Sequence, residues 1–303
     1  AMFVAEMSDA SPAVELVLGG EPRPEALMSA GGERALTMDV RVGASTHPWL
    51  RGHTIGGAVV VPVALVAEWF ARAAAALRPD LPFDCLHDVA VLRGIRLPDF
   101  DDQVARFVLS ARQLSNGRGA ELELTLHAAD GTPHYRARAT MLEQNGVPRT
   151  PAAVPALRLD DWGGAPIYGD VLFHSDAFQV IRELDGIGAT GISGTLSGVR
   201  AAGWVWERWT TDVAAIDGAL QLALLWARQE LGGAVLPMGI GTLRVDGPLP
   251  DGPVTCLAQC VSLGANKARA DVALLDADGR RFATLQGVEL VLRPDAPAAR
   301  LRA

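Results

Sequence analysis

Two polar groups with complementary chemistry each stand beside the start of a long apolar segment. His53 precedes the segment that begins near Pro62, and Asp217 lies near the start of a second one at about residues 215–230. An imidazole can take a proton near neutral pH, and a carboxyl group in apolar surroundings can hold one. A base and an acid opposed across an apolar slot suit dehydration or hydration of a substrate.

The sequence after His53 combines a glycine turn with a helix start. Gly56 and Gly57 follow the histidine, and Pro62 is a favourable first-turn residue. Glycines let the backbone approach a ligand closely, and N–H groups at a helix start favour a developing negative charge. This combination suits removal of a proton next to a carbonyl group. The alternative is a loop histidine hydrogen-bonded near a helix cap.

Asp217 lies in the apolar segment AAIDGALQLALL, with Gln221 one helical turn later on the same face. Burial in such a segment should raise the pKa of the carboxyl group. The alternative is a carboxylate that caps the helix N-terminus. Because each half of the chain places one polar group at the start of its buried helix, packing the halves together could bring the two groups face to face.

The two halves of the chain have the same order of predicted elements. Residues 120–131 and 268–279 are alternating strands that end in Asp-Gly turns, 148 residues apart, and each is followed by another strand. One long apolar helix precedes each pair, at residues 62–77 and at about 215–230. We therefore predict an α+β fold made of two copies of a helix packed on an antiparallel sheet, with the sheets joined edge to edge.

A stretch with three prolines and no periodicity separates the copies. The predicted organisation is an N-terminal repeat at residues 12–145, a linker at 146–166 and a C-terminal repeat at 167–292. The first dozen residues and residues 293–303 are expected to be tails.

Composition excludes several classes of function. The 303 residues are 49% hydrophobic and 20% charged, which supports a sizeable core. The net charge of −8 and the lack of a basic run argue against nucleic-acid or membrane partners. The most apolar stretch, residues 55–67, is shorter than the roughly 20 residues that a membrane-spanning helix needs.

The cysteines and the single lysine offer no cofactor chemistry. Cys85, Cys256 and Cys260 are a sparse, odd set with no signal peptide, which indicates a reducing compartment, and we expect the cytoplasm. Cys256 and Cys260 should lie on one face of a strand as buried residues, because no second ligand pair follows at zinc spacing. Lys267 lies in a turn-like segment and is discounted as a Schiff-base residue. No metal site is predicted.

The motifs can now be compared with known sequences. Residues 53–62 have the form HxxxGxxxxP, and residues 217–221 have the form DxxxQ. These resemble the two signatures of dehydratase domains of polyketide synthases and related multifunctional fatty-acid synthases. The run HPWLRGH at residues 47–53, and Leu236-Pro237 before the strand MGIGTLRV, are also similar to the family.

The similarity extends from about Val14 to Leu292, and it implies a double hotdog fold, in which two long helices are each wrapped by an antiparallel sheet. It also implies roles for the residues. His53 would remove the α-proton of a (3R)-hydroxyacyl thioester, and Asp217, positioned by Gln221, would protonate the departing 3-hydroxyl group. The product would be an α,β-unsaturated, usually trans, acyl thioester.

The remaining implications concern binding. The backbone N–H of Gly57, at the start of the first helix, would hold the thioester carbonyl. The acyl chain would arrive on the phosphopantetheine arm of an acyl carrier protein, so that the chain itself binds no cofactor. Neighbouring synthase domains and a second copy in a homodimer are further expected partners. Because carrier proteins tend to be acidic, arginines should gather at the docking surface, with Arg93, Arg96 and Arg208 as candidates.

One motif departs from the family. At the opening of the second half the family often carries Tyr-Gly-Pro-x-Phe-Gln, whereas residues 173–179 read FHSDAFQ. Phe178 and Gln179 match, and His174 takes the place of the tyrosine. The Phe-His beginning resembles the Phe-His-Gly-Pro form of polyunsaturated fatty-acid and some iterative synthases. His174 is expected either to donate to Asp217 or to be a structural histidine.

The predicted catalytic residues are thus His53, Asp217 and Gln221. The predicted substrate-binding residues are Gly57, Pro62, His174, Phe178, Leu236 and Pro237. Two alternatives to a simple dehydratase stay open, one a catalytic variant within this family and the other a non-catalytic domain. A variant could shift a double bond or close an oxygen ring after dehydration. A non-catalytic hotdog domain could hold synthase modules together or bind acyl chains.

Overall fold

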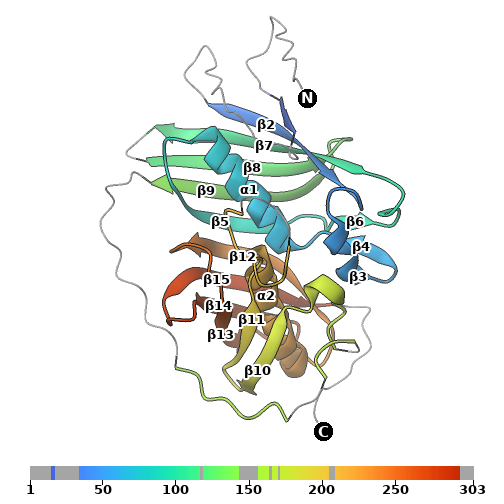
Figure 1. Ribbon diagram of the computed structural model, residues 1–303, viewed down its shortest axis with the longest axis vertical. Coiled ribbons are helices and arrows are strands. Elements are labelled where there is room, and N and C mark those ends of the chain that lie inside the picture. Colours follow the sequence, from blue (N-terminus) through green and yellow to red (C-terminus); the bar gives the residue numbers. More distant parts are fainter. Residues whose placement is uncertain are drawn as a thin grey trace, which may run out of the picture.

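The structure is a computed structural model that describes residues 15–17, 34–116, 119–142, 156–163, 166–169, 171–204 and 209–293. It contains two long helices, α1 (Val63–Leu77) and α2 (Val213–Leu231), each packed against an antiparallel part of one sheet (Figure 1). Residues 1–12 and 294–303 of the predicted tails, and residues 146–155 and 164–165 of the predicted linker, lie outside the described residues.

Twelve strands form a sheet that runs through both halves, in the order β1-β2-β7-β8-β9-β5-β12-β15-β14-β13-β11-β10. The strands of the first half are β1 (Glu15–Val17), β2 (Ala35–Val42), β5 (Phe83–Val91), β7 (Ala105–Asn116), β8 (Gly119–Ala128) and β9 (Pro133–Leu142). Those of the second half are β10 (Ile181–Gly188), β11 (Gly191–Ser197), β12 (Val235–Val245), β13 (Pro253–Ser262), β14 (Lys267–Leu275) and β15 (Arg281–Leu292). The predicted α+β architecture is confirmed.

The two halves join where β5 pairs with β12. The pairing is antiparallel, with Leu86 opposite Leu243 and His87 opposite Thr242. Each of these strands is the first long strand after the helix of its own half. Outward from the seam, the next strand on each side is the last strand of that half, and the strands that follow run backward along the sequence. Pairing at the seam satisfies the backbone groups of two strands that would otherwise be exposed edges.

The helix boundaries follow from local sequence. The first helix begins close to Pro62, as predicted, but Pro62 is its N-cap in an extended conformation and the first helical residue is Val63. The start of α2 is set by Asp212, whose side chain accepts a hydrogen bond from Ala215 N–H over 2.9 Å. Gly232 ends α2 in the left-handed conformation, with φ of 75°. Since Asp212 is the cap, the alternative capping role for Asp217 is wrong.

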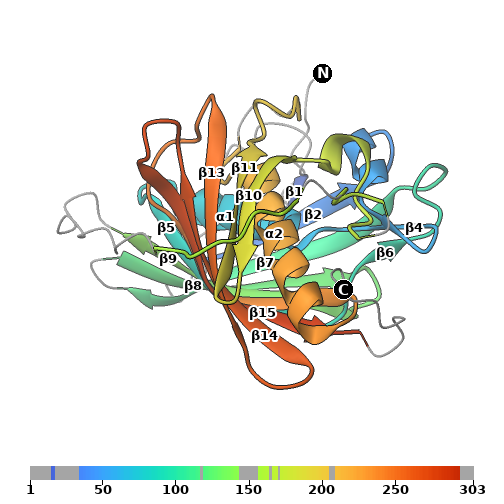
Figure 2. The same ribbon diagram turned by 90° about the horizontal axis from the view of Figure 1, so that it is seen from below.

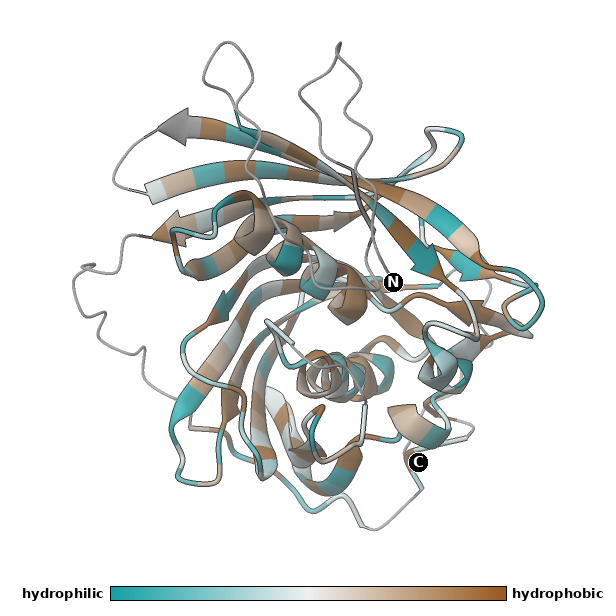
Figure 3. Ribbon diagram, turned by 45° about the horizontal axis from the view of Figure 1, so that its top comes forward, coloured by the Kyte–Doolittle hydropathy of each residue, from teal (hydrophilic) through white to brown (hydrophobic). Residues whose placement is uncertain are grey.

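The sheet curves around α2, drawn in orange in Figure 2, and the core lies between the helices and the inner strand faces. Brown and teal bands alternate along the strands in Figure 3, as expected for strands with one buried face. Cys256 and Cys260 follow this alternation, because both are buried on the same face of β13. Their burial is as predicted, and both thiols are free.

Short elements at one end of the molecule carry the candidate site. They are the 3₁₀ helices η1 (Pro48–Gly52) and η2 (Asp176–Phe178) and a small sheet of β3 (Thr54–Ile55), β4 (Ala58–Val60) and β6 (Arg96–Leu97). The 3₁₀ helices come from different halves and lie against each other. None of the helices in the described part of the chain has the length and apolar character needed to cross a bilayer.

Candidate active site

His53 follows η1, and its ring is oriented by the backbone of β4. The Nδ1 atom lies 2.7 Å from the carbonyl oxygen of Val60. A carbonyl oxygen can only accept, so Nδ1 carries the ring proton and Nε2 keeps a lone pair. Burial lowers the pKa of His53 to about 4, and the hydrogen bond to Val60 opposes this shift. The ring is therefore neutral at neutral pH, with Nε2 able to accept a proton.

Asp217 and Gln221 lie one turn apart on α2, and both are buried. Gln221 Nε2 donates to Asp217 Oδ2 over 2.8 Å and to the carbonyl oxygen of Phe178 over 2.9 Å. Burial raises the pKa of Asp217 to about 7, and the bond from Gln221 opposes this shift. A substantial fraction of the carboxyl group is thus protonated near neutral pH. Because Oδ2 accepts from the amide, the proton is favoured on Oδ1.

Tyr168 holds the Gln221 amide in this orientation. Its hydroxyl accepts from Ile181 N–H over 2.8 Å and donates to Gln221 Oε1 over 3.0 Å. The hydroxyl proton therefore points at Gln221 Oε1, which leaves the amide N–H groups for Asp217 and Phe178. Sequence reasoning missed Tyr168, because it follows the proline-rich linker and belongs to no recognised motif. The one available signal is that the chain has only two tyrosines.

His53, His174 and Asp217 converge at one point between the halves. One nitrogen or oxygen atom of each lies within 4.8 Å of the other two. His174 Nε2 is 3.8 Å from Asp217 Oδ2, which is longer than a hydrogen bond, so the expected donation to Asp217 is not made. Burial lowers the pKa of His174 well below its usual value. The predicted base and acid thus have a second neutral imidazole beside them.

The backbones of Gly52 and Ser175 bring these groups together. Ser175 N–H donates to Gly52 O over 2.9 Å. A Cβ atom on Gly52 would lie only 2.2 Å from the carbonyl oxygen of Ser175, so no other residue fits without moving the backbone. Gly52 precedes His53 and Ser175 follows His174, so this close contact sets the spacing of the two imidazole rings.

An aromatic cluster closes one side of the site. The Phe178 ring lies 4.9 Å from the His53 ring and 4.7 Å from the Trp204 ring, measured between centroids. Trp49 stacks on Trp204 with centroids 4.4 Å apart. Phe178 therefore contributes twice, since its carbonyl oxygen fixes Gln221 and its ring covers His53. Its predicted place in the site is supported by these contacts.

Glu68 of α1 fixes the segment that leads into α2. It is fully buried and accepts hydrogen bonds from Thr210 N–H, from the N–H and hydroxyl of Thr211, and from Arg72 Nε. Burial raises the pKa of Glu68, and these donors oppose the shift. The next residue along the chain, Asp212, caps α2. This network therefore sets the position of the helix that carries the candidate acid relative to α1.

The expectation that Gly57 lies at the start of the first helix is wrong. Gly56 and Gly57 form the two-residue turn between β3 and β4, with φ of 57° and 77°. Two adjacent residues with positive φ are typical of a tight hairpin, which is why glycines occur there. Gly57 is exposed, and α1 begins six residues later at Val63. Its N–H is not one of the free donors of the helix start.

Three other predicted substrate-binding residues cap a helix or pair within the sheet. Pro62 caps α1, while Leu236 and Pro237 lie near the start of β12, opposite Val291 and Leu290 of β15. Their contact with substrate stays a prediction.

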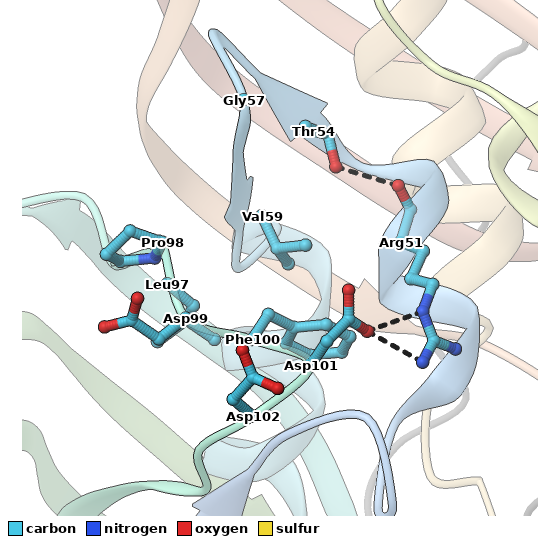
Figure 4. A pocket seen from close by; sticks show the side chains of 10 residues that line it. All are labelled: Arg51, Thr54, Gly57, Val59, Leu97, Pro98, Asp99, Phe100, Asp101 and Asp102. Atoms are coloured by element: carbon cyan, nitrogen blue, oxygen red, sulfur yellow. Dashed lines mark hydrogen bonds and ion pairs between the residues drawn. The ribbon is translucent and has the colours of Figure 1, made fainter.

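A surface pocket of about 320 Å³ lies beside the β3–β4 hairpin (Figure 4). It contains Gly57 but none of the three converging side chains. Its lining carries three aspartates against one arginine: Asp99, Asp101, Asp102 and Arg51. Arg51 pairs with Asp101 over 2.7 Å, which leaves the lining acidic. This charge does not suit an acidic carrier protein. Of the predicted docking arginines, Arg93 and Arg96 are exposed and Arg208 lies outside the described residues.

Two family comparisons cover most of the chain. Residues 147–299 match the family described as the polyketide synthase dehydratase N-terminal domain. Residues 25–129 match the family described as the polyketide synthase dehydratase domain. One relative is a polyunsaturated fatty acid synthase chain of Thraustochytrium sp., which is 25% identical over 258 residues. The match covers 82% of this chain and only 9% of that protein.

Solved structures with the same fold include the dehydratase domain from the CurF module of curacin polyketide synthase. It is 16% identical with a TM-score of 0.66, and the match covers 90% of this chain and 96% of that one. Another is the dehydratase domain of PpsC from Mycobacterium tuberculosis in complex with C12:1-CoA. It is 20% identical with a TM-score of 0.66, over 88% of this chain and 97% of that one. These similarities concern the fold, and the predicted double hotdog architecture is confirmed.

Proposed function

This chain belongs to the polyketide synthase dehydratase domains, and from that we propose that His53 is its catalytic base and Asp217 its catalytic acid. The family consists of hydro-lyases that act on 3-hydroxyacyl thioesters. Gln221 and Tyr168 are proposed as positioning residues for the acid. The reaction needs a base and an acid at neighbouring carbons of one ligand, and the groups available for both roles lie at one point.

The proposed reaction balances with these two residues alone. His53 Nε2 takes the proton on the carbon next to the thioester carbonyl, and the electrons of that bond form the double bond. The bond from the next carbon to its hydroxyl oxygen breaks, while Asp217 gives that oxygen a proton, so that water leaves. Hydroxide is a poor leaving group, which is why the acid must be protonated before turnover. Transfer of a proton from His53 to Asp217 restores the starting state.

The observation that carries this proposal is the convergence of two buried groups from different halves, which burial holds in opposite protonation states. Burial holds the pKa of His53 at about 4 and that of Asp217 at about 7, so the first is neutral and the second is largely protonated between these values. A ring nitrogen of His53 and a carboxylate oxygen of Asp217 lie within 4.8 Å of each other. Perturbed pKa values of this kind, arranged as a base and an acid, are typical of catalytic sites.

The finer substrate and the partners are also proposed. The substrate is a (3R)-3-hydroxyacyl chain on the phosphopantetheine of an acyl carrier protein, and the product is the enoyl thioester, so the chain holds no cofactor of its own. The domain works beside other domains of a polyketide or polyunsaturated fatty-acid synthase, in the cytoplasm, and as a homodimer. The Thraustochytrium relative supports such a setting, since this chain matches 9% of a longer synthase chain.

The test is incubation of the chain with a 3-hydroxyacyl pantetheine thioester, followed by mass spectrometry for loss of one water. We expect wild type to form the enoyl product, and His53→Ala and Asp217→Asn each to reduce turnover by about 100-fold or more. His127→Ala, on β8, serves as the control and should react like wild type. A folded wild type without product would instead favour a structural domain. Unchanged turnover in His53→Ala would require another base.

A further inference from the structure

We propose that His53, His174 and Asp217 form a binding site for Zn²⁺, with Nε2 of each histidine and one carboxylate oxygen as ligands. All three side chains are buried, and their donor atoms lie within 4.8 Å of one another. Within the described part of the chain, no other group of three or more His, Cys, Asp or Glu side chains has this spacing. Two imidazoles and a carboxylate, with a fourth position open, are an established ligand set for zinc.

The distances are near those of a bound metal. Tetrahedral zinc bonds of about 2.0–2.2 Å place donor atoms roughly 3.3–3.6 Å apart. His174 Nε2 and Asp217 Oδ2 are already 3.8 Å apart. The most distant donors, at up to 4.8 Å, need to approach by about 1 to 1.5 Å. Rotation of these side chains about their χ angles is the movement that the proposal requires.

The nitrogen donors are available. The proton of His53 is on Nδ1, where it is bonded to Val60 O, so the Nε2 lone pair is uncommitted. The Nδ1 atom of His174 is buried and has no hydrogen-bond partner among the described residues. That nitrogen can therefore carry the ring proton and leave Nε2 as a ligand at no cost in hydrogen bonds.

The surroundings also resemble the outer contacts of metal sites. Metal-binding histidines usually donate their other ring N–H to a carbonyl or carboxylate oxygen, and ligating carboxylates are themselves hydrogen-bonded. The bonds from His53 to Val60 O and from Gln221 to Asp217 have these two forms. The His174 ring is held by stacking on Phe173, with centroids 4.0 Å apart and an interplanar angle of 24°.

His174 decides whether the site can hold a metal. His53 and Asp217 alone supply two ligands, one fewer than the three protein ligands of open zinc sites. Zn²⁺ at this point would occupy the His53 lone pair, and Asp217 would release its proton to bind as a carboxylate. Bound Zn²⁺ should therefore block dehydration. That consequence rests on the proposed function, whereas metal binding itself does not.

The test starts with protein freed of metal by a chelator and then desalted. Isothermal titration with Zn²⁺ should give one ion per chain, and Co²⁺ should give the intense visible bands of tetrahedral coordination. His174→Phe keeps the stacking on Phe173 and should weaken metal binding at least about tenfold, with loss of the tetrahedral bands. Cys85→Ser probes a rival location, since Cys85 Sγ lies 3.1 Å from His87 Nε2, and should bind metal like wild type.

Three results would overturn the site: no Zn²⁺ uptake by wild type at millimolar metal, wild-type affinity in folded His174→Phe, or loss of binding in Cys85→Ser. Activity is measured separately. Zn²⁺ should inhibit wild-type dehydration and a chelator should restore it, whereas full activity with metal bound would contradict the blocking role. Tetrahedral binding by a folded chain that forms no enoyl product would support the metal site and contradict the proposed function.

Discussion

The carbonyl oxygen of Ser175 occupies the place where a side chain on Gly52 would begin, 2.2 Å from an ideal Cβ position. Backbone from the two halves of the molecule meets at this contact, and Ser175 N–H is bonded to Gly52 O. His53 directly follows Gly52, and His174 directly precedes Ser175. Both imidazole rings are therefore carried by residues next to this contact. The geometry of the site therefore depends on the absence of one methyl group.

Gly52→Ala should accordingly separate the two segments. We expect a loss of about 1–3 kcal/mol in the free energy of unfolding, typical of overpacking, together with a marked fall in turnover. Urea denaturation and the thioester assay measure the two effects. Gly94→Ala is the matched control, because a Cβ atom at Gly94 meets nothing within 4 Å and its φ is not positive. Equal stability and activity of Gly52→Ala and wild type would contradict the tight contact.

The pH dependence of dehydration should have two limbs. Because the pKa of Asp217 is raised to about 7, the acid is lost and kcat/KM should fall as the pH rises above that value. Because the pKa of His53 is lowered to about 4, the base stays neutral down to that value, and activity should fall only below it. The profile is measured with a chelator present. A maximum well above pH 7 would argue against a protonated Asp217 as the acid.

Tyr168→Phe tests whether the hydroxyl positions Gln221. Without it, Gln221 Oε1 is buried with no donor, at a cost of about 1–3 kcal/mol, and the amide can turn away from Asp217. Since the bond from Gln221 lowers the pKa of Asp217, its loss should shift the alkaline limb to higher pH and reduce kcat more than it changes KM. A purely structural role would lower stability without moving the limb. Tyr135→Phe, at the other tyrosine, is the control.

Glu68→Ala should destabilise the chain by at least about 3 kcal/mol. The substitution leaves Thr210 N–H and Thr211 N–H without their acceptor and removes the carboxylate that pairs with Arg72 from one side of a buried network. Chemical denaturation gives the free energy of unfolding. Glu123→Ala removes an exposed ion pair to Arg112 and should change stability by less than about 1 kcal/mol. Similar losses in both variants would show that the buried network carries no special stability.

The sequence was sufficient for those parts of the fold that depend on local periodicity. Both helices and the strand pairs with Asp-Gly turns could be predicted, because alternation and long apolar runs specify them directly. The edge-to-edge seam was predicted by a different argument, since two tandem copies of one sheet protect their exposed edge strands by pairing them. Asp217 and Gln221 could be paired for the same reason, since a spacing of four residues on a helix places them on one face.

Features that depend on contacts between distant segments could not be predicted. Tyr168 reaches Gln221 across 53 residues of sequence, and Gly52 meets Ser175 across the two halves. Neither contact has a periodic signal. The position of Gly57 could have been predicted, since two glycines between short alternating stretches indicate a hairpin, but the helix-start interpretation took precedence.

Each central helix carries a buried carboxyl group with a hydrogen-bond donor four residues later, but the two carboxyl groups differ in how many donors they have. Glu68, the sixth residue of α1, is bonded by Arg72 four positions later, and Asp217, the fifth residue of α2, is bonded by Gln221 at the same interval. Glu68 is saturated by donors, whereas one oxygen of Asp217 remains for a proton. The two halves therefore use their helix carboxyl groups differently: Glu68 holds the segment before α2 against α1, whereas Asp217 keeps an oxygen that can carry the proton required by the proposed reaction.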